Sequence, residues 1–178
     1  DPTAILNDAM IGAMAVVGDN FKKEIIFVPQ MLAAARAMKA GVEVLKPYLA
    51  TGEAGSAGTI ILGTVAGDLH DIGKNLVALM LRNYGYKVID LGKDVPADVI
   101  IETAIKEDAD IIGLSALMTT TMMEMKKVVN MKKKQNVRAK VIIGGAVITQ
   151  GFADEIGADG YSKDAQDAVE VVGRLLAD

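Results

Sequence analysis

One short segment of the chain, residues 67–75, combines residues whose types and spacing could support chemistry. It contains His70, the only histidine of the sequence, with Asp68 and Asp71 on either side and with Gly67 and Gly73 at its flanks. Asp68 can accept a hydrogen bond from the His70 ring and so fix the tautomer of the imidazole, as carboxylates do for metal-bound histidines. A lone histidine can also be an exposed residue without a role, so the place of this segment in the fold decides its interpretation.

The counts of cysteine and histidine exclude several kinds of site. With no cysteine and one histidine in 178 residues, the chain has no disulfide framework, no thiol nucleophile and no iron–sulfur cluster. An ordinary zinc site, which needs several nitrogen or sulfur ligands, is excluded as well. Any chemistry must therefore depend on carboxylates, hydroxyls, the backbone or His70.

Two phosphate-binding interpretations of residues 67–75 can be compared with the sequence. The flanking glycines resemble those of a P-loop, but five residues instead of four separate them, and Asn75 stands where a serine or threonine would hold magnesium. A phospho-receiver domain would use the two carboxylates of this segment and a lysine such as Lys163. That domain also needs an aspartate after the third strand, where this chain has Ser115.

Composition disfavours nucleic acids and membranes as partners. The net charge is −4, the isoelectric point is near 5.1, and only 4% of the residues are aromatic. Nucleic-acid-binding surfaces usually have an excess of positive charge and aromatic rings for stacking. The longest apolar runs are far shorter than the roughly 20 residues that span a bilayer. With no signal-like start, we expect a cytoplasmic protein.

From residue 59 onward, short β-branched runs alternate with helical stretches, as in a parallel sheet with helices on both faces. We expect strands at 59–65, 87–91, 110–114, 140–143 and 160–161, and helices at 74–84, 96–107, 121–134, 149–156 and 165–176. The predicted fold class is α/β, a flavodoxin-like (βα)5 parallel sheet of order 2-1-3-4-5. Because such sheets bind ligands beyond the carboxyl ends of their strands, residues 67–75 lie at the expected site.

The first fifty residues have helical periodicity instead. One amphipathic helix is expected after Asp1-Pro2, and a second after a break at 27–29. Their many methionines are interpreted as residues that fill gaps in a core. The glycine-rich segment 51–58 predicts a linker. The expected division is a helical unit at 1–50, the linker at 51–58 and an α/β domain at 59–178.

Asp68, His70 and Gly73 together form a D-x-H-x-x-G motif, which resembles the signature of cobalamin-binding proteins. Ser115-x-Leu117 after the third strand and Gly144-Gly145 after the fourth correspond to the second and third elements of that family. The first two helices are similar to half of the four-helix cap of methionine synthase and of corrinoid proteins in methyl-transfer systems. We expect another copy to complete the bundle, or further amino-terminal helices to precede this sequence.

The resemblance implies a cobalamin or related cobamide as cofactor, with His70 as the lower axial cobalt ligand. The benzimidazole tail would then leave cobalt and enter a slot in the domain. Asp68 and Thr121 would form a proton relay with the histidine, although Thr121 could instead only cap the following helix, as in a capping box. Further cofactor-binding positions implied by the family are Gly67, Leu69, Asp71, Gly73, Ser115, Leu117, Thr119, Gly144 and Gly145. Phe21 and Val28 match the residues that the cap places over the methyl group.

The function implied by the resemblance is that of a corrinoid methyl carrier. Its partners would be a substrate-specific methyltransferase, an acceptor methyltransferase that uses coenzyme M or tetrahydrofolate, and a reductive activator. General likeness favours a methylamine system. The alternatives are a cobalamin-dependent sensor, the cobalamin module of a mutase, and a flavodoxin-like interaction module without a cofactor.

Overall fold

A computed structural model describes residues 5–45 and 58–177 of the chain. Apart from Gly58, the predicted linker lies outside these residues, and the predicted domain boundaries remain a prediction. Five parallel strands form one sheet in the order β2-β1-β3-β4-β5, which confirms the expected topology. Their bounds are β1 (Thr59–Thr64), β2 (Lys87–Asp90), β3 (Ile111–Ser115), β4 (Lys140–Gly144) and β5 (Gly160–Ser162).

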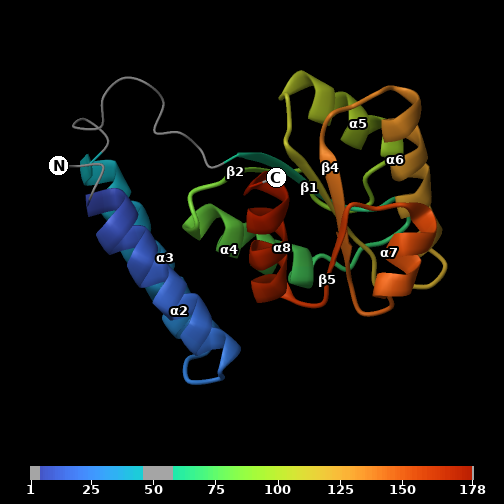
Figure 1. Cartoon of the computed structure of the whole chain (residues 1–178). Helices are drawn as coiled ribbons and strands as arrows, with labels where there is room; N and C mark the ends of the chain where they lie inside the picture. Colours follow the sequence, from blue (N-terminus) through green and yellow to red (C-terminus); the bar gives the residue numbers. More distant parts are fainter. Residues whose placement is uncertain (1–4, 46–57, 178) are drawn as a thin grey trace.

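Helices cover both faces of this sheet (Figure 1). One face packs against α5 (Ala97–Lys106), α6 (Met122–Lys134) and α7 (Gln150–Ile156), and the other against α4 (Ile72–Asn83) and α8 (Ala165–Ala177). The central strands are buried on both sides because their sequences are almost continuously apolar. Two separate apolar clusters result, one on each face of the sheet.

The amino-terminal segment forms a helical pair outside α4 and α8 (Figure 1). It consists of a π-helical segment (Ile5–Ile11), then α2 (Gly12–Lys22) and α3 (Val28–Leu45). The periodicity predicted helix here but not the π-helical start, because seven residues make about two turns and do not separate helix types. Met31 of α3 is 1% exposed and belongs to the apolar cluster of α4 and α8, as expected for a core methionine. None of the described helices is long and apolar enough to span a bilayer.

Candidate functional site

The loop after β1 is built around the buried carboxylate of Asp68. Its Oδ1 accepts hydrogen bonds from the backbone N–H of His70 (3.0 Å) and from the ring Nδ1 of His70 (2.9 Å). Its Oδ2 accepts from the backbone N–H groups of Leu117 (2.7 Å) and Met118 (3.3 Å) and from the hydroxyl of Thr121 (2.7 Å). One side chain therefore ties the loop after β1 to the loop after β3.

These hydrogen bonds keep Asp68 ionised. Burial alone raises the pKa of its carboxyl group, because a charge is costly to remove from water. The hydrogen bonds donated by the backbone of His70 and Leu117, by the Thr121 hydroxyl and by the His70 ring outweigh burial and hold the pKa far below its usual range. The site thus contains a fixed negative charge beneath the histidine.

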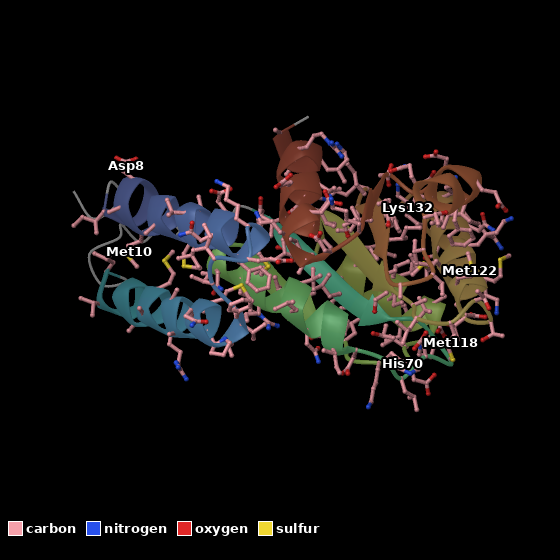
Figure 2. All side chains as sticks on the ribbon, turned by 90° about the horizontal axis from the view of Figure 1, so that it is seen from below. Asp8, Met10, His70, Met118, Met122 and Lys132 are labelled. Carbon is pink, nitrogen blue, oxygen red and sulfur yellow. The ribbon has the colours of Figure 1, made fainter. Side chains whose placement is uncertain are left out.

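The carboxylate of Asp68 determines which nitrogen of His70 can bind a metal. Because an ionised carboxylate only accepts hydrogen bonds, Nδ1 of the neutral ring carries the proton and Nε2 keeps its lone pair. The side chain is 53% exposed, and His70 and Met118 lie at the same edge of the molecule (Figure 2). The imidazole is therefore oriented as in metal sites whose histidine is backed by a carboxylate.

Thr121 stands at the N-cap position of α6, but its side chain makes no capping hydrogen bond. Its hydroxyl lies 2.7 Å from Asp68 Oδ2 and 3.0 Å from the carbonyl oxygen of Met118. Of the two interpretations of the sequence, a contact with Asp68 is present and the capping box is absent. Hydrogen bonds therefore connect Thr121 through Asp68 to His70 without a gap.

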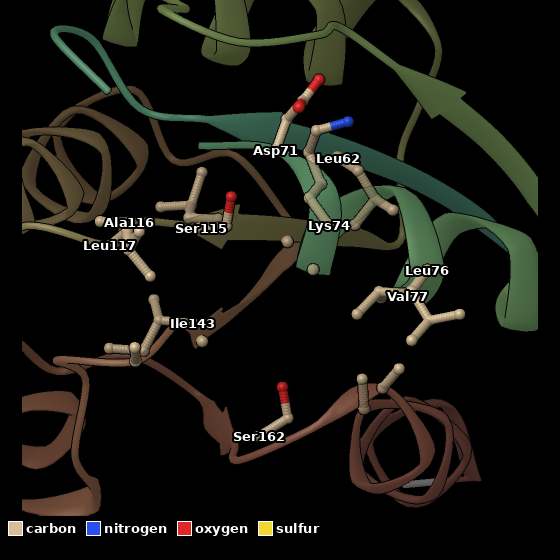
Figure 3. A pocket seen from close by; sticks show the side chains of 18 of the residues that line it. Leu62, Asp71, Lys74, Leu76, Val77, Ser115, Ala116, Leu117, Ile143 and Ser162 are labelled. Atoms are coloured by element: carbon tan, nitrogen blue, oxygen red, sulfur yellow. The ribbon is translucent and has the colours of Figure 1, made fainter. Parts of the chain in front are cut away.

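Beside the histidine, an apolar slot of about 610 Å³ opens between the first turns of α4 and α8, against the sheet. Figure 3 shows Leu76 and Val77 of α4 and Ile143 of β4 around this space. Leu69, His70 and Asp71 stand at its edge. The slot and the exposed imidazole are thus parts of one site.

Several glycines shape this site, for different reasons. A Cβ at Gly73 would have no heavy atom within 4 Å, so the missing side chain leaves open space in the wall of the slot. A Cβ at Gly145 would collide with the carbonyl oxygen of Ala116, and the φ angle of Gly145 is 134°. Glycine at 145 is thus required by the approach of two loops, independently of any ligand.

Lys74 ties the first turn of α4 to the end of β2. Its ammonium group lies 2.5 Å from Asp90 Oδ1 and 2.7 Å from Asn75 Oδ1, and its side chain is buried. A buried charge of this kind is tolerated because it is paired and hydrogen-bonded. The ion pair holds in place the helix that carries Gly73.

The structure brings together most of the residues that the sequence singled out. Those that line the slot are Leu69, His70, Asp71, Gly73, Ser115, Leu117, Gly144 and Gly145. Asp68 lies next to them and is hydrogen-bonded to His70, and Thr121 is hydrogen-bonded to Asp68.

Besides Asp68 and Thr121, four of the expected residues do not line the slot: Gly67, Thr119, Phe21 and Val28. Gly67 adopts a φ of 79° and donates its N–H to Asp94, and Thr119 is exposed. Phe21 packs against the apolar cluster of α4 and α8, while Val28, at the start of α3, is 41% exposed. Their predicted contacts with the cofactor remain predictions.

Sequence reasoning missed other slot residues, including Gly113, Ile142 and Ser162. Gly113 could have been found, because a glycine inside an apolar strand often marks a close approach. Ser162 gives no such signal, since only the pairing of β4 with β5 places it beside Gly144.

These features fit a corrinoid better than a metal held by the protein alone. No group of three or more metal-ligating side chains occurs in the described part of the chain, so His70 can supply one ligand while a macrocycle supplies the others. The apolar slot and the open space at Gly73 have the character needed for an aromatic tail.

Comparisons with known proteins show which protein family the chain belongs to. Residues 58–170 match a family model described as a B12 binding domain, and residues 1–46 match a second model with the same description. The chain therefore belongs to the B12-binding domain family and binds a cobalamin or related corrinoid.

Individual proteins similar to this chain carry more specific descriptions than the family models. Dimethylamine corrinoid protein 1 of Methanosarcina acetivorans is 46% identical over 180 residues, which cover 99% of this chain and 84% of that protein. Trimethylamine corrinoid protein 2 of the same organism is 44% identical, covering 97% and 81%. The crystal structure of the methanol:cobalamin methyltransferase complex MtaBC from Methanosarcina barkeri matches with a TM-score of 0.87 and 34% identity, covering 99% of this chain and 68% of the matched chain.

Proposed function

We propose that the chain carries methyl groups in a corrinoid-dependent methyltransferase system, with His70 Nε2 as the lower cobalt ligand and the cobamide base in the slot. The observation that carries this proposal is the Asp68–His70 contact of 2.9 Å. It leaves Nε2 as the free donor atom, directly beside an apolar slot. When bound, the corrinoid supplies a cobalt centre that accepts a methyl group and gives it up.

The residues of the chain have separate tasks in this function. Asp68 orients His70 and would stabilise a positive charge on the ring if Nε2 held a proton instead of a metal. Thr121 donates to the other carboxylate oxygen and keeps Asp68 in position. Protonation of His70 is thereby coupled to whether the metal is bound, which is the purpose of the proposed relay.

The methyl donor and acceptor would be bound by partner proteins. The likeness to dimethylamine and trimethylamine corrinoid proteins supports a methylamine-specific methyltransferase as the donor partner. We propose that this enzyme and an acceptor methyltransferase approach the edge that carries His70, and that a reductive activator acts on the same cofactor. Exposed apolar side chains at this edge, with Ile72 at 86% and Leu69 at 60%, support a surface that is covered in the functional assembly.

A role for Phe21 and Val28 over the upper face of the corrin remains a proposal. In the arrangement described above, Phe21 faces the cluster of α4 and α8 and Val28 is partly exposed. Such a role requires the helical pair to lie over the slot edge instead of beside α4.

The test is the visible spectrum of the protein reconstituted with cobalamin. Wild type should give the spectrum of cobalamin whose own base has left cobalt and whose lower ligand is a histidine. His70→Ala should lose the histidine-ligated signature, because no other imidazole exists in the chain. Thr103→Ala, a change on α5 at the opposite face of the sheet, serves as the control and should keep the signature. An unchanged spectrum in His70→Ala would remove the ligand assignment.

A further inference from the structure

On the face of the sheet that α4 and α8 cover, the strand register sorts residues at the carboxyl ends of the strands into two rows. Thr64, Ser115, Gly144 and Ser162 are paired in sequence across β1, β3, β4 and β5 and form the row at the carboxyl end. Two residues deeper, Leu62, Gly113, Ile142 and Gly160 form a second row. The inner row offers no polar side chain, whereas the outer row offers three hydroxyls.

The three hydroxyls of the outer row differ in their partners. Thr64 and Ser115 are hydrogen-bonded to each other at 2.7 Å. Ser162 is only 7% exposed, and its hydroxyl makes no hydrogen bond within residues 5–45 and 58–177. Figure 3 shows the Ser162 hydroxyl pointing from β5 into the pocket. A hydroxyl that faces the slot and has no partner among the described residues is free to donate to a ligand or accept from one.

Gly144 keeps the Ser162 hydroxyl accessible from the slot. A Cβ at position 144 would lie 2.9 Å from the carbonyl oxygen of Ser162 and 3.1 Å from its Oγ. Any larger residue at 144 would therefore crowd the hydroxyl. The glycine that the sequence motif identified thus has a definite effect on a residue that the motif did not include.

The surroundings of Ser162 favour a neutral ligand group over an anion. The start of α8 is already occupied by its own carboxylates, since Asp164 Oδ1 accepts from the Asp167 N–H and Asp167 Oδ2 accepts from the Lys163 N–H. These two backbone N–H groups are therefore not available to a phosphate. The apolar inner row requires an apolar ring at greater depth.

We propose that Ser162 is a cofactor-binding residue whose hydroxyl binds a neutral polar atom of the cobamide tail. This inference rests on the proposed function, because it requires the tail to enter the slot. The atom is a ring nitrogen of the lower base or a hydroxyl of the ribose. A ring nitrogen that has left cobalt needs a hydrogen-bond donor inside the protein, and Ser162 offers one.

The experiment measures the affinity of Ser162→Ala and wild type for three ligands. These are cobalamin, a cobamide whose phenolic lower base lacks a ring nitrogen, and cobinamide, which lacks the tail. We expect Ser162→Ala to bind cobalamin about tenfold more weakly, the effect of one lost hydrogen bond, and to bind cobinamide unchanged. A loss confined to cobalamin identifies the ring nitrogen, and an equal loss with the phenolic cobamide identifies the ribose.

The apo protein provides an independent measurement. Because the hydroxyl has no partner among the described residues, Ser162→Ala should melt at the same temperature as wild type or at a higher one. Thr103→Ala, which removes a hydroxyl from α5 on the opposite face of the sheet, is the matched control and should leave cobalamin affinity unchanged.

Unchanged cobalamin affinity in Ser162→Ala, or an equal loss for cobinamide, would overturn the assignment of Ser162 alone, while wild type still shows its histidine-ligated spectrum. Failure of wild type to bind cobalamin would overturn the proposed function, and this inference with it.

Discussion

At the scale of single residues, Asp68 is the centre of the site. It accepts five hydrogen bonds, two from His70 and one each from Leu117, Met118 and Thr121. A carboxylate with so many donors stays ionised and immobile. It can therefore orient an imidazole without being protonated by it.

Asp68→Asn should lower the free energy of unfolding of the apo protein by about 3 kcal/mol at pH 7, because several hydrogen bonds to a buried charge are lost. The measurement is urea unfolding of both proteins. Asp71 is a carboxylate in the same loop whose side chain makes no hydrogen bond in the described structure. Asp71→Asn should therefore change the free energy of unfolding little.

The same comparison has a defined pH dependence. The pKa of Asp68 is lowered in the folded protein, so its contribution to stability is fully present above its unfolded pKa, near 4, and is lost as the pH falls through the folded value. The difference in free energy of unfolding between wild type and Asp68→Asn should shrink as the pH falls below about 4, where Asp68 begins to be protonated in the unfolded chain. A difference that does not shrink below about pH 4 would contradict this account.

At the scale of secondary-structure elements, the glycines of α4 and of the loop after β4 serve different purposes. Gly73 borders open space at the first turn of α4, whereas Gly145 is confined by the backbone of Ala116. Substitutions should therefore separate ligand binding from folding.

Gly73→Leu should leave the melting temperature of the apo protein unchanged or raise it, because leucine favours helix and meets no neighbour at its Cβ. The added side chain occupies the slot, so cobalamin affinity should fall by about ten- to a hundredfold. Gly145→Ala should instead reduce the apo stability by about 3 kcal/mol. Thermal melts and cobalamin titrations of both variants test the pair, and normal cobalamin affinity in Gly73→Leu would refute the role of Gly73.

At the scale of the whole molecule, the helical pair is held to the α/β domain by a small apolar contact. Met31 of α3 is fully buried there, together with Val17 and Phe21 at the edge of the cluster. The sheet has its own large core on the opposite face. The two parts therefore need not unfold together.

Met31→Ala should weaken this contact by about 3 kcal/mol, the usual cost of truncating a buried methionine. Hydrogen exchange followed by mass spectrometry should show faster exchange in α2 and α3 and unchanged protection in β1 and β3. Leu32→Ala, a partly exposed neighbour on the same helix, is the control. Faster exchange throughout the sheet would show instead that the helical pair and the domain unfold as one unit.

The sequence by itself determined the layout of the chain. Apolar runs such as those of β1 and β3 predicted the strands to within one residue, because burial on both faces of a parallel sheet requires continuous apolar sequence. Only α4 begins noticeably earlier than expected, at Ile72 instead of residue 74. The motif around His70 also predicted the Asp68 contact, since two residues of separation keep these side chains within reach.

The tertiary structure decided what depends on residues that are distant in sequence. It made Thr121 a donor to Asp68 and not a helix cap, because the loops after β1 and β3 meet at the sheet edge. It placed Ser162 beside Gly144 through the pairing of β4 with β5, and it directed Phe21 toward α4 and α8. Periodicity shows which side of a helix is apolar, but only the packing of separate elements selects the surface that this side covers.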